Sequence, residues 1–123
     1  MDDAKYIELL EKVREYDFWN LTFKNELIRV EWDKGFHLSA SVFFDKGGIP
    51  KPIRRFVSTF RSKNQRLWVN VSQKEVFLTH KFTFFGDADD FQYILDHFYE
   101  EILRWRDFFD NLSREDLVFI SKK

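Results

Sequence analysis

Apolar positions in this chain recur with two different periods, which predict its helices and its strands. A spacing of i, i+3, i+4 and i+7, typical of an amphipathic helix, occurs three times. The predicted helices cover about residues 3–16, 50–62 and 88–110. An acidic residue just before the first helix and Asp87 before the last are the expected N-caps. The pair Ser113 and Asp116 resembles a further capping box and predicts a short separate helix over residues 117–120.

Alternation of apolar and polar residues, typical of half-buried strands, marks most of the remaining chain. Five strands are predicted, over residues 18–23, 27–32, 36–44, 67–71 and 76–85. Turn residues separate the first three, which therefore form an antiparallel meander. Aromatic residues on both sides of the last strand indicate that both of its faces are covered, at least at its end. The sequence thus predicts a single α+β domain over residues 1–123, with the order α-β-β-β-α-β-β-α and helices packed on a five-stranded antiparallel sheet.

The composition excludes several classes of protein. With 123 residues, 44% of them hydrophobic, the chain can build one core. No run approaches the roughly 18–20 apolar residues that cross a bilayer, and the N-terminal residues do not resemble a secretory signal. We therefore expect a cytoplasmic protein with no membrane partner. Because the chain has no cysteine, disulfides and zinc–thiolate sites are excluded.

The motifs that carry catalytic chemistry are missing from the sequence. The three histidines, His37, His80 and His97, lack the spacing that would bring two metal ligands together. Phosphate-binding glycine loops and the common nucleophile motifs are also absent. We therefore expect a non-catalytic protein without a cofactor or a metal site. Carboxylates gathered around His37 or His80 in a deep pocket would instead indicate an enzyme.

The net charge of −1 conceals two segments of opposite charge. Residues 46–66 contain seven basic side chains and no acidic one, whereas residues 87–110 contain eight acidic and two basic ones. Three interpretations remain open. The two predicted helices can lie together and compensate each other, the basic segment can bind an acidic protein partner, or it can contact the phosphates of a nucleic acid. Nucleic acid is the least favoured of the three.

Aromatic residues are more numerous than a small core requires, with 16 Phe, 4 Trp and 4 Tyr. Those outside the apolar stripes either form an exposed binding surface or fill a sheet that is covered on both faces. These residues are Phe43, Trp68, Phe77, Phe85, Tyr99 and Phe108. Arginine and aromatic anchors dominate protein interfaces. The predicted partner-binding residues are therefore Arg54, Arg55, Arg61, Arg66, Trp68 and Phe85.

The order and length of the predicted elements resemble the type III secretion chaperone-like fold, a group that includes class I secretion chaperones and YbjN-like regulators. The local similarity lies over residues 64–109, where a Trp-Val-Asn strand, a turn, a second strand and a long helix after Gly86-Asp87 follow one another. The resemblance implies a non-catalytic protein-binding module with a chaperone-like or regulatory role, and a homodimer as one option. Arginines on the middle helix would repel each other across a two-fold axis, which argues against that dimer. The alternative function is a phage- or toxin-system inhibitor or immunity-type protein that occludes a target's active or nucleic-acid-binding site.

Overall fold

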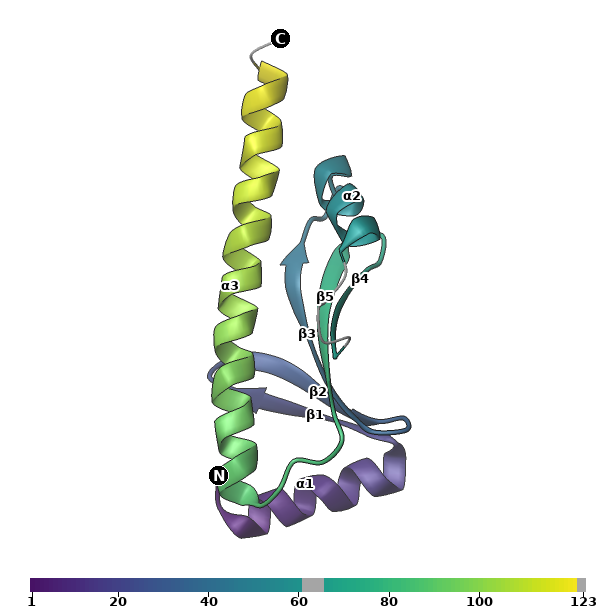
Figure 1. The fold of residues 1–123 in the computed structure, drawn as a ribbon, viewed down its shortest axis with the longest axis vertical. Coiled ribbons are helices and arrows are strands. Elements are labelled where there is room, and N and C mark those ends of the chain that lie inside the picture. The colour runs from purple at the N-terminus through teal and green to yellow at the C-terminus, as the bar shows by residue number, and fades with distance from the viewer. Residues whose placement is uncertain (61–65, 122–123) are drawn as a thin grey trace.

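Helices and strands follow one another in the predicted order, α-β-β-β-α-β-β-α (Figure 1). The computed structural model describes residues 1–60 and 66–121, with side chains up to residue 114. Its elements are α1 (Asp3–Tyr16), β1 (Phe18–Phe23), β2 (Glu26–Trp32), β3 (Phe36–Phe44), α2 (Lys51–Thr59), β4 (Leu67–Val71), β5 (Glu75–Phe82) and α3 (Ala88–Ser121).

The strands of the described chain form one antiparallel sheet in the order β1-β2-β3-β5-β4. Strand β3 is central: it pairs with β2 on one side and with β5 on the other, where Ala40 faces Leu78. The chain leaves β3 through α2, forms the edge strand β4 and returns along β5. The α+β class and the five-stranded antiparallel sheet are therefore confirmed.

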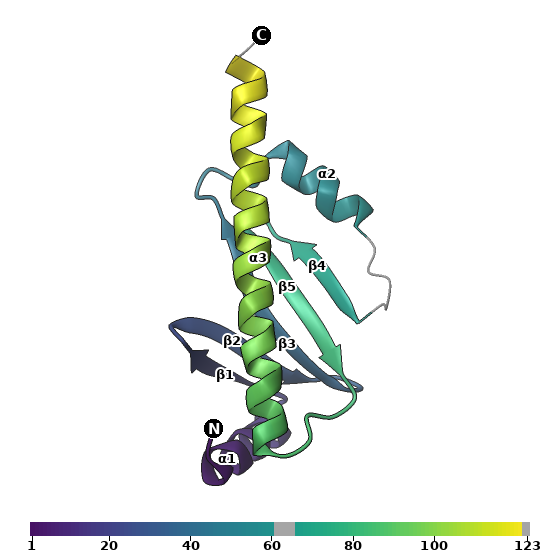
Figure 2. The same cartoon turned by 60° about the vertical axis from the view of Figure 1, so that its left-hand side comes forward.

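The helices cover one face of this sheet. Alternate strand residues such as Ile28, Val30 and Leu38 are 0% exposed, and they share one hydrophobic core with buried residues of α1, α2 and α3. Helix α3 runs across this side of the sheet (Figure 2). The strand residues in between are mostly polar and partly exposed; on β5 they are Phe77, Thr79 and Lys81, of which only Thr79 is buried. The prediction that both faces of the last strand are covered is therefore wrong, because no described helix packs on its outer face.

Local chemistry explains where the turns and the helix starts fall. Lys24 and Asn25 both have positive φ, 48° and 67°, as a two-residue type I′ hairpin turn requires. The Asp2 side chain accepts a hydrogen bond from a backbone N–H in the first turn of α1 and so caps that helix. Before α3, the N–H of Asp90 donates to Asp87 at 2.8 Å, and the N–H of Asp87 donates to Asp90 at 3.1 Å. This reciprocal capping box confirms Asp87 as the N-cap of α3.

Helix α3 is longer than the sequence pattern predicts. It continues without a break to Ser121 (Figure 1), so Ser113 is not an N-cap and the separate helix predicted over residues 117–120 is wrong. The reason is that no glycine or proline between residues 88 and 121 ends the helix. None of the described helices, α3 included, combines the length and hydropathy needed to span a membrane.

Two other elements are shorter than predicted. Helix α2 ends at Thr59, because Phe60 already has extended backbone angles, φ −64° and ψ 132°; residues 61 and 62 lie outside the described chain. Strand β5 ends at Phe82, and the alternation breaks there: Phe84 is 72% exposed and Phe85 only 2%. The chain leaves the sheet at this point to reach the start of α3.

Candidate functional site: the uncovered face of the sheet

The face of the sheet turned away from the helices carries ordered rows of polar and aromatic side chains. Directly paired residues of antiparallel strands project from the same face, so the strand register defines these rows. One row crosses all five strands through Asn20, Arg29, Ser39, Thr79 and Trp68. A second row contains Phe18, Glu31, His37 and Lys81, and a third contains Ser41, Phe77 and Asn70. We call these residues together the uncovered face.

An open hollow of about 410 Å³ lies in the middle of the uncovered face. Side chains from four strands line it, together with Asp33 from the turn between β2 and β3. Trp68 and Phe77 supply aromatic surface, while Arg29 and Glu31 supply charges of both signs. The hollow therefore offers stacking surface, hydrogen-bonding groups and charge to a molecule that docks on the sheet.

Trp68 and His37 form the aromatic centre of the uncovered face. Their ring centroids are 5.6 Å apart and their planes meet at 69°, an edge-to-face arrangement. In the strand register His37 lies between Glu31 and Lys81, so an acid and a base flank it. This edge-to-face contact holds the indole of Trp68 against the sheet, so its position is set before a partner arrives.

The hydroxyl groups of Ser39 and Thr79 share a hydrogen bond of 3.0 Å. Thr79 is 7% exposed, and this bond satisfies its buried hydroxyl. Within the described residues, neither hydroxyl is hydrogen-bonded to a histidine or a carboxylate. The pair thus lacks the adjacent base that a serine or threonine nucleophile needs, and its geometry is that of a sheet contact.

Arg29 lies at the β1 side of the uncovered face. Its guanidinium carbon is 3.9 Å from the centroid of the Phe18 ring, and its Nη2 atom is 3.6 Å from Oε1 of Glu31. Both members of this ion pair are exposed, so the pair contributes only about 0–1 kcal/mol to stability. The arginine is therefore oriented by its neighbours and still accessible to a partner.

Two of the six predicted partner-binding residues belong to this region. Trp68 stands on the uncovered face, and Arg66 is an exposed residue beside it. The carbonyl of Arg66 accepts a hydrogen bond of 2.7 Å from the N–H of Lys81, which places Arg66 next to the second row. Arg61 lies outside the described residues.

The arginines of α2 lie apart from Trp68, because α2 packs on the helix side of the sheet. Arg54 donates hydrogen bonds of 3.3 Å to the carbonyls of Ser72 and Gln73, in the turn between β4 and β5. Arg55 is exposed. The predicted basic and aromatic residues therefore do not form one continuous site.

Phe85 is a core residue rather than a surface residue. It is 2% exposed and stacks on Phe36, with ring centroids 4.3 Å apart, and it also contacts Phe91 at 4.7 Å. Its prediction as a partner contact is wrong. The predicted strand would have placed Phe85 on the outer face, but β5 ends before it and its side chain turns inward.

Helices α2 and α3 meet through aromatic rings. The ring of Phe56 lies 4.8 Å from that of Phe108 and 5.8 Å from those of Trp105 and Phe109. Phe108 is 40% exposed at the rim of this cluster. Across residues 1–60 and 66–114, no ion pair joins α2 to α3. Direct charge pairing between the two helices, one of the three interpretations of the charge pattern, is not observed in this part of the chain.

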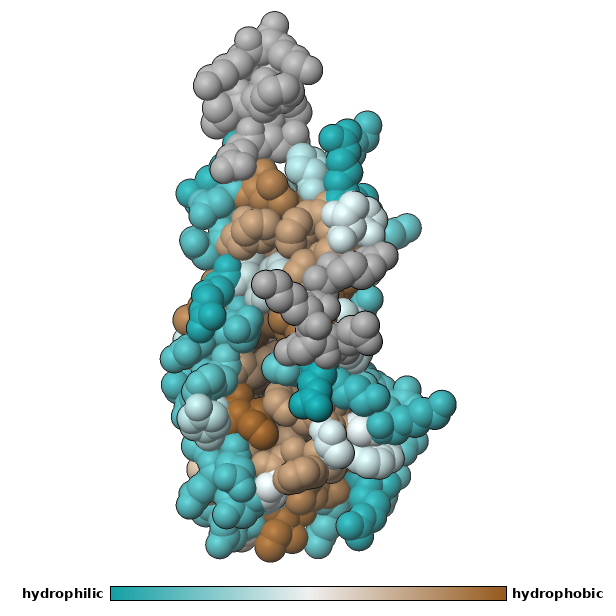
Figure 3. Space-filling model, viewed as in Figure 1, coloured by the Kyte–Doolittle hydropathy of each residue, from teal (hydrophilic) through white to brown (hydrophobic). Residues whose placement is uncertain are grey.

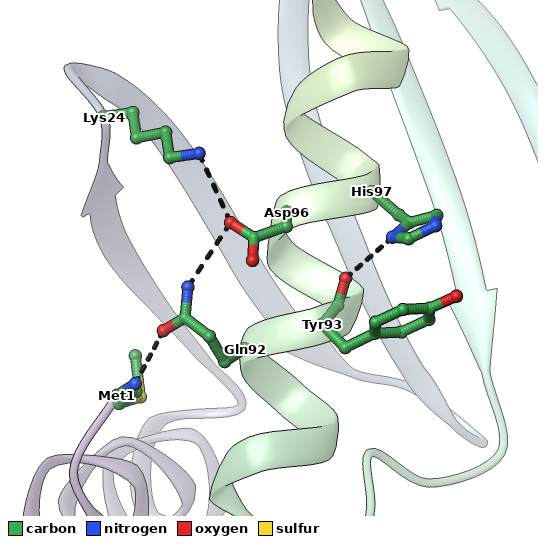
Figure 4. A network of polar contacts seen from close by, with 6 residues as sticks. All are labelled: Met1, Lys24, Gln92, Tyr93, Asp96 and His97. Carbon is green, nitrogen blue, oxygen red and sulfur yellow. Dashed lines mark hydrogen bonds and ion pairs between the residues drawn. The ribbon is translucent and has the colours of Figure 1, made fainter.

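Acidic and polar side chains of α3 are linked to the N-terminal part of the chain (Figure 4). The amino group of Met1 donates to Oε1 of Gln92 at 2.6 Å, and Nε2 of Gln92 donates to Asp96 at 3.4 Å. Asp96 also lies 3.3 Å from Nζ of Lys24 in the β1–β2 turn. These contacts connect three segments that are distant in sequence, and the network is therefore structural.

The remaining histidines lie away from the uncovered face. His80 is on the helix side of β5 and stacks on Phe82 at 4.3 Å. Burial lowers the pKa of His80, Glu101 raises it to a smaller extent, and Arg66 lowers it. His97 is exposed on α3, where its Nδ1 atom is 3.1 Å from the carbonyl of Tyr93 (Figure 4).

The uncovered face brings His37 together with Glu31 and Asp33 in one hollow. That hollow is open to solvent, so these residues do not form the deep pocket that would indicate an enzyme. Among the described residues, no group of three or more histidine, cysteine or acidic side chains could hold a metal ion. The arrangement can bind a partner by stacking, hydrogen bonds and charge.

Sequence reasoning identified single residues of this face but not the face itself. The alternation over residues 36–44 already placed His37 and Ser39 on a polar side. Their neighbours in the rows come from β4 and β5, about thirty to forty positions further along the chain. Only the strand register shows that these side chains are adjacent.

Comparison of the chain with protein-family models, with curated proteins and with solved structures finds no match. The geometry described above therefore carries the functional argument.

Proposed function

We propose that the protein is a non-catalytic protein-binding module that engages a protein partner through the uncovered face of its sheet. The observation that carries this proposal is the Trp68–His37 pair, an aromatic centre surrounded by polar and charged side chains on a face that no described helix covers. Protein interfaces have this composition, with an aromatic centre and a polar rim.

The type of residue at the centre supports a protein partner. Tryptophan and arginine are over-represented among the residues that dominate binding energy, and Trp68 and Arg29 both line the hollow. Trp68 is already oriented by His37, so little side-chain entropy is lost on binding. These features favour a protein surface that inserts an apolar group into the hollow.

The charges of the uncovered face disfavour a nucleic acid. Glu31 and Asp33 line the same hollow as Trp68 and would repel phosphate groups. A protein surface can match both signs of charge, with an acid opposite Arg29 and a base opposite Glu31. The exposed arginines of α2 remain a second, separate contact for an acidic protein partner.

The proposed binding is compatible with both functions that the sequence raised. A chaperone-like or regulatory protein, as the resemblance to secretion chaperones and YbjN-like regulators implies, would hold its client on this face. An inhibitor or immunity-type protein would use the same face to occlude a target. Both need an accessible Trp68.

Affinity purification from the native host tests the proposal with three variants. Trp68→Ala alters the uncovered face, Arg54→Glu/Arg55→Glu alters α2, and Tyr93→Ala is the matched control because Tyr93 is an aromatic residue 66% exposed on α3. We expect a co-purifying protein that is lost with Trp68→Ala and retained with Tyr93→Ala. Loss only with the α2 variant would move the interface to the basic helix. Equal recovery with every variant would refute the proposal.

Two further measurements separate the alternatives. Light scattering of the purified chain gives its mass, and a dimer that dissociates on Trp68→Ala would identify the partner as a second copy. Salt-dependent retention on heparin or DNA that is lost with Arg54→Glu/Arg55→Glu would instead support nucleic acid as the partner of the basic segment.

A further inference from the structure

A second hollow, of about 550 Å³, lies beside α1 on the helix side of the sheet. Its principal lining residues are Leu10, Val13 and Arg14 from α1, Trp32 and Phe36 from β2 and β3, and Phe84 from the segment after β5. In Figure 3 hydrophobic side chains form a band down the middle of the molecule towards α1 at its lower end. The hollow has no part in the uncovered face.

The wall of this hollow continues into the packed core. The rings of Trp32 and Phe36 meet edge-on, with centroids 4.9 Å apart, and Phe36 stacks on the buried Phe85 at 4.3 Å. Val13 on the opposite side is 1% exposed. Because these side chains are fixed by their neighbours, the hollow is formed before a ligand binds, as in most small-molecule sites.

Large apolar side chains stand at the rim of the hollow. Phe84 is 72% exposed and Trp32 is 47% exposed. Adjacent exposed aromatic surface of this kind marks a binding site more often than scattered apolar residues do. A ligand with an apolar body would cover both rings.

Arg14 is the one charged residue that lines the hollow. Within the described residues its guanidinium makes no ion pair and no hydrogen bond. Arg14 lies in the last turn of α1, where a cation also suits the helix dipole. The interaction of Arg14 with the helix dipole would change the stability of the protein but not its affinity for a ligand. A binding measurement therefore distinguishes the two roles of Arg14.

We infer that this hollow binds a small carboxylic acid with an apolar chain, of the size of a medium-chain fatty acid. The apolar chain would lie between Leu10, Phe36 and Phe84, and the carboxylate would pair with Arg14. Small-molecule sites are typically about 300–1,000 Å³, predominantly apolar and supplied with a few polar groups. The volume and the single cation match that description.

An NMR titration of the full chain with decanoate tests the inference. The chain has four tryptophans and hence four indole N–H signals, and Trp32→Phe assigns the signal of Trp32. We expect that signal to shift saturably with decanoate. The indole signal of Trp68, on the uncovered face, is the internal control and should stay in place.

Variants at the hollow separate the contributions of charge and of apolar surface. Arg14→Gln should weaken decanoate about fivefold and leave the neutral analogue decanol unchanged, whereas Phe84→Ser should weaken both. Arg55→Gln is the matched control, because Arg55 is an exposed arginine on another element. Decanoate binding that responds equally to Arg14→Gln and Arg55→Gln would overturn the inference.

Three other outcomes would also overturn it. They are the absence of saturation, equal shifts of Trp32 and Trp68, and tighter binding of a short apolar peptide with a free C-terminal carboxylate than of decanoate. The last result would identify a protein C-terminus as the occupant. Because Trp68→Ala leaves this hollow intact, the inference and the proposed protein binding succeed or fail separately.

Discussion

The guanidinium of Arg106 donates two hydrogen bonds to the carboxylate of Glu26, at 2.6 and 2.9 Å, although the residues are 80 positions apart. Nη2 of Arg106 also donates to the carbonyl of Ser41 at 3.1 Å. One side chain of α3 therefore holds both β2 and β3. Paired hydrogen bonds of this type are the strong form of the arginine–carboxylate interaction.

The first prediction concerns Glu26 and acid. Hydrogen bonds from Arg106 lower the pKa of Glu26 from its ordinary value of 4.5. The ionised form is therefore favoured in the folded state, so its contribution is complete above pH 4.5 and is lost as the pH falls through the folded-state pKa. Glu26→Gln should lower the free energy of unfolding by about 1–2 kcal/mol at pH 7. Urea unfolding at pH 7 and pH 3 measures the difference, which should shrink at pH 3; an equal loss at both values would contradict the prediction.

His80 provides a second pH dependence. Burial is the main reason why its pKa lies below the ordinary 6.5, and Glu101 of α3 opposes the shift. The unfolded chain thus binds the proton more readily, so stability is complete above pH 6.5 and declines as the pH falls below it. His80→Gln should flatten the change in urea midpoint between pH 7.5 and pH 5. The exposed His97→Gln is the control, and an unchanged slope in His80→Gln would show that other groups are responsible.

The third prediction concerns the aromatic contact between α2 and α3, where the stability lost on removing a ring should depend on how deeply that ring is buried. Phe109 is 0% exposed, whereas its neighbour Phe108 is 40% exposed. Phe109→Ala leaves a cavity and should cost about 3–5 kcal/mol, while Phe108→Ala should cost markedly less. Thermal and urea unfolding of the two variants give the comparison. Similar losses of stability in the two variants would contradict the prediction, because burial would then not determine the contribution of each ring.

The capping box at the start of α3 gives the fourth prediction. Asp87→Ala removes the acceptor for the N–H of Asp90 and should cost about 1 kcal/mol. Asp89→Ala is the matched control, since Asp89 is an exposed acid in the same turn. Urea unfolding should show the larger loss for Asp87→Ala, and the reverse order would exclude a capping role.

Local patterns accounted for most of the fold and for only part of the candidate site. The alternation in residues 36–44 and the turns between the first three strands depend only on neighbouring residues, so the sequence predicts them. The sequence does not predict the burial of Phe85, because whether the last strand ends at residue 82 or 85 depends on where α3 must begin. The sequence pattern also does not show that α3 continues past Ser113, because the backbone N–H groups inside an intact helix are already bonded and need no cap.

The uncovered face depended on information that local patterns do not contain. Trp68 and His37 are far apart in sequence, and they meet only because β5 pairs with both β3 and β4. Charge arithmetic also gave an incomplete view, since α2 contacts α3 through Phe56 while acidic Asp96 pairs with Lys24 of the first hairpin. The net charge of a segment does not show which residues its charged side chains contact.

The pairing of β3 with β5 also sets an order of events during synthesis. Ser39 must wait for Thr79, 40 residues later, before the central ladder can form. Helix α1 covers part of the apolar side of β1 and β2, but the apolar side of β3 stays uncovered until Phe91, Phe98 and Ile102 of α3 are synthesised. Contacts of such long range slow folding. A nascent chain that stops before residue 88 therefore lacks the helix that covers β3, and such a chain is a substrate for chaperones and for aggregation.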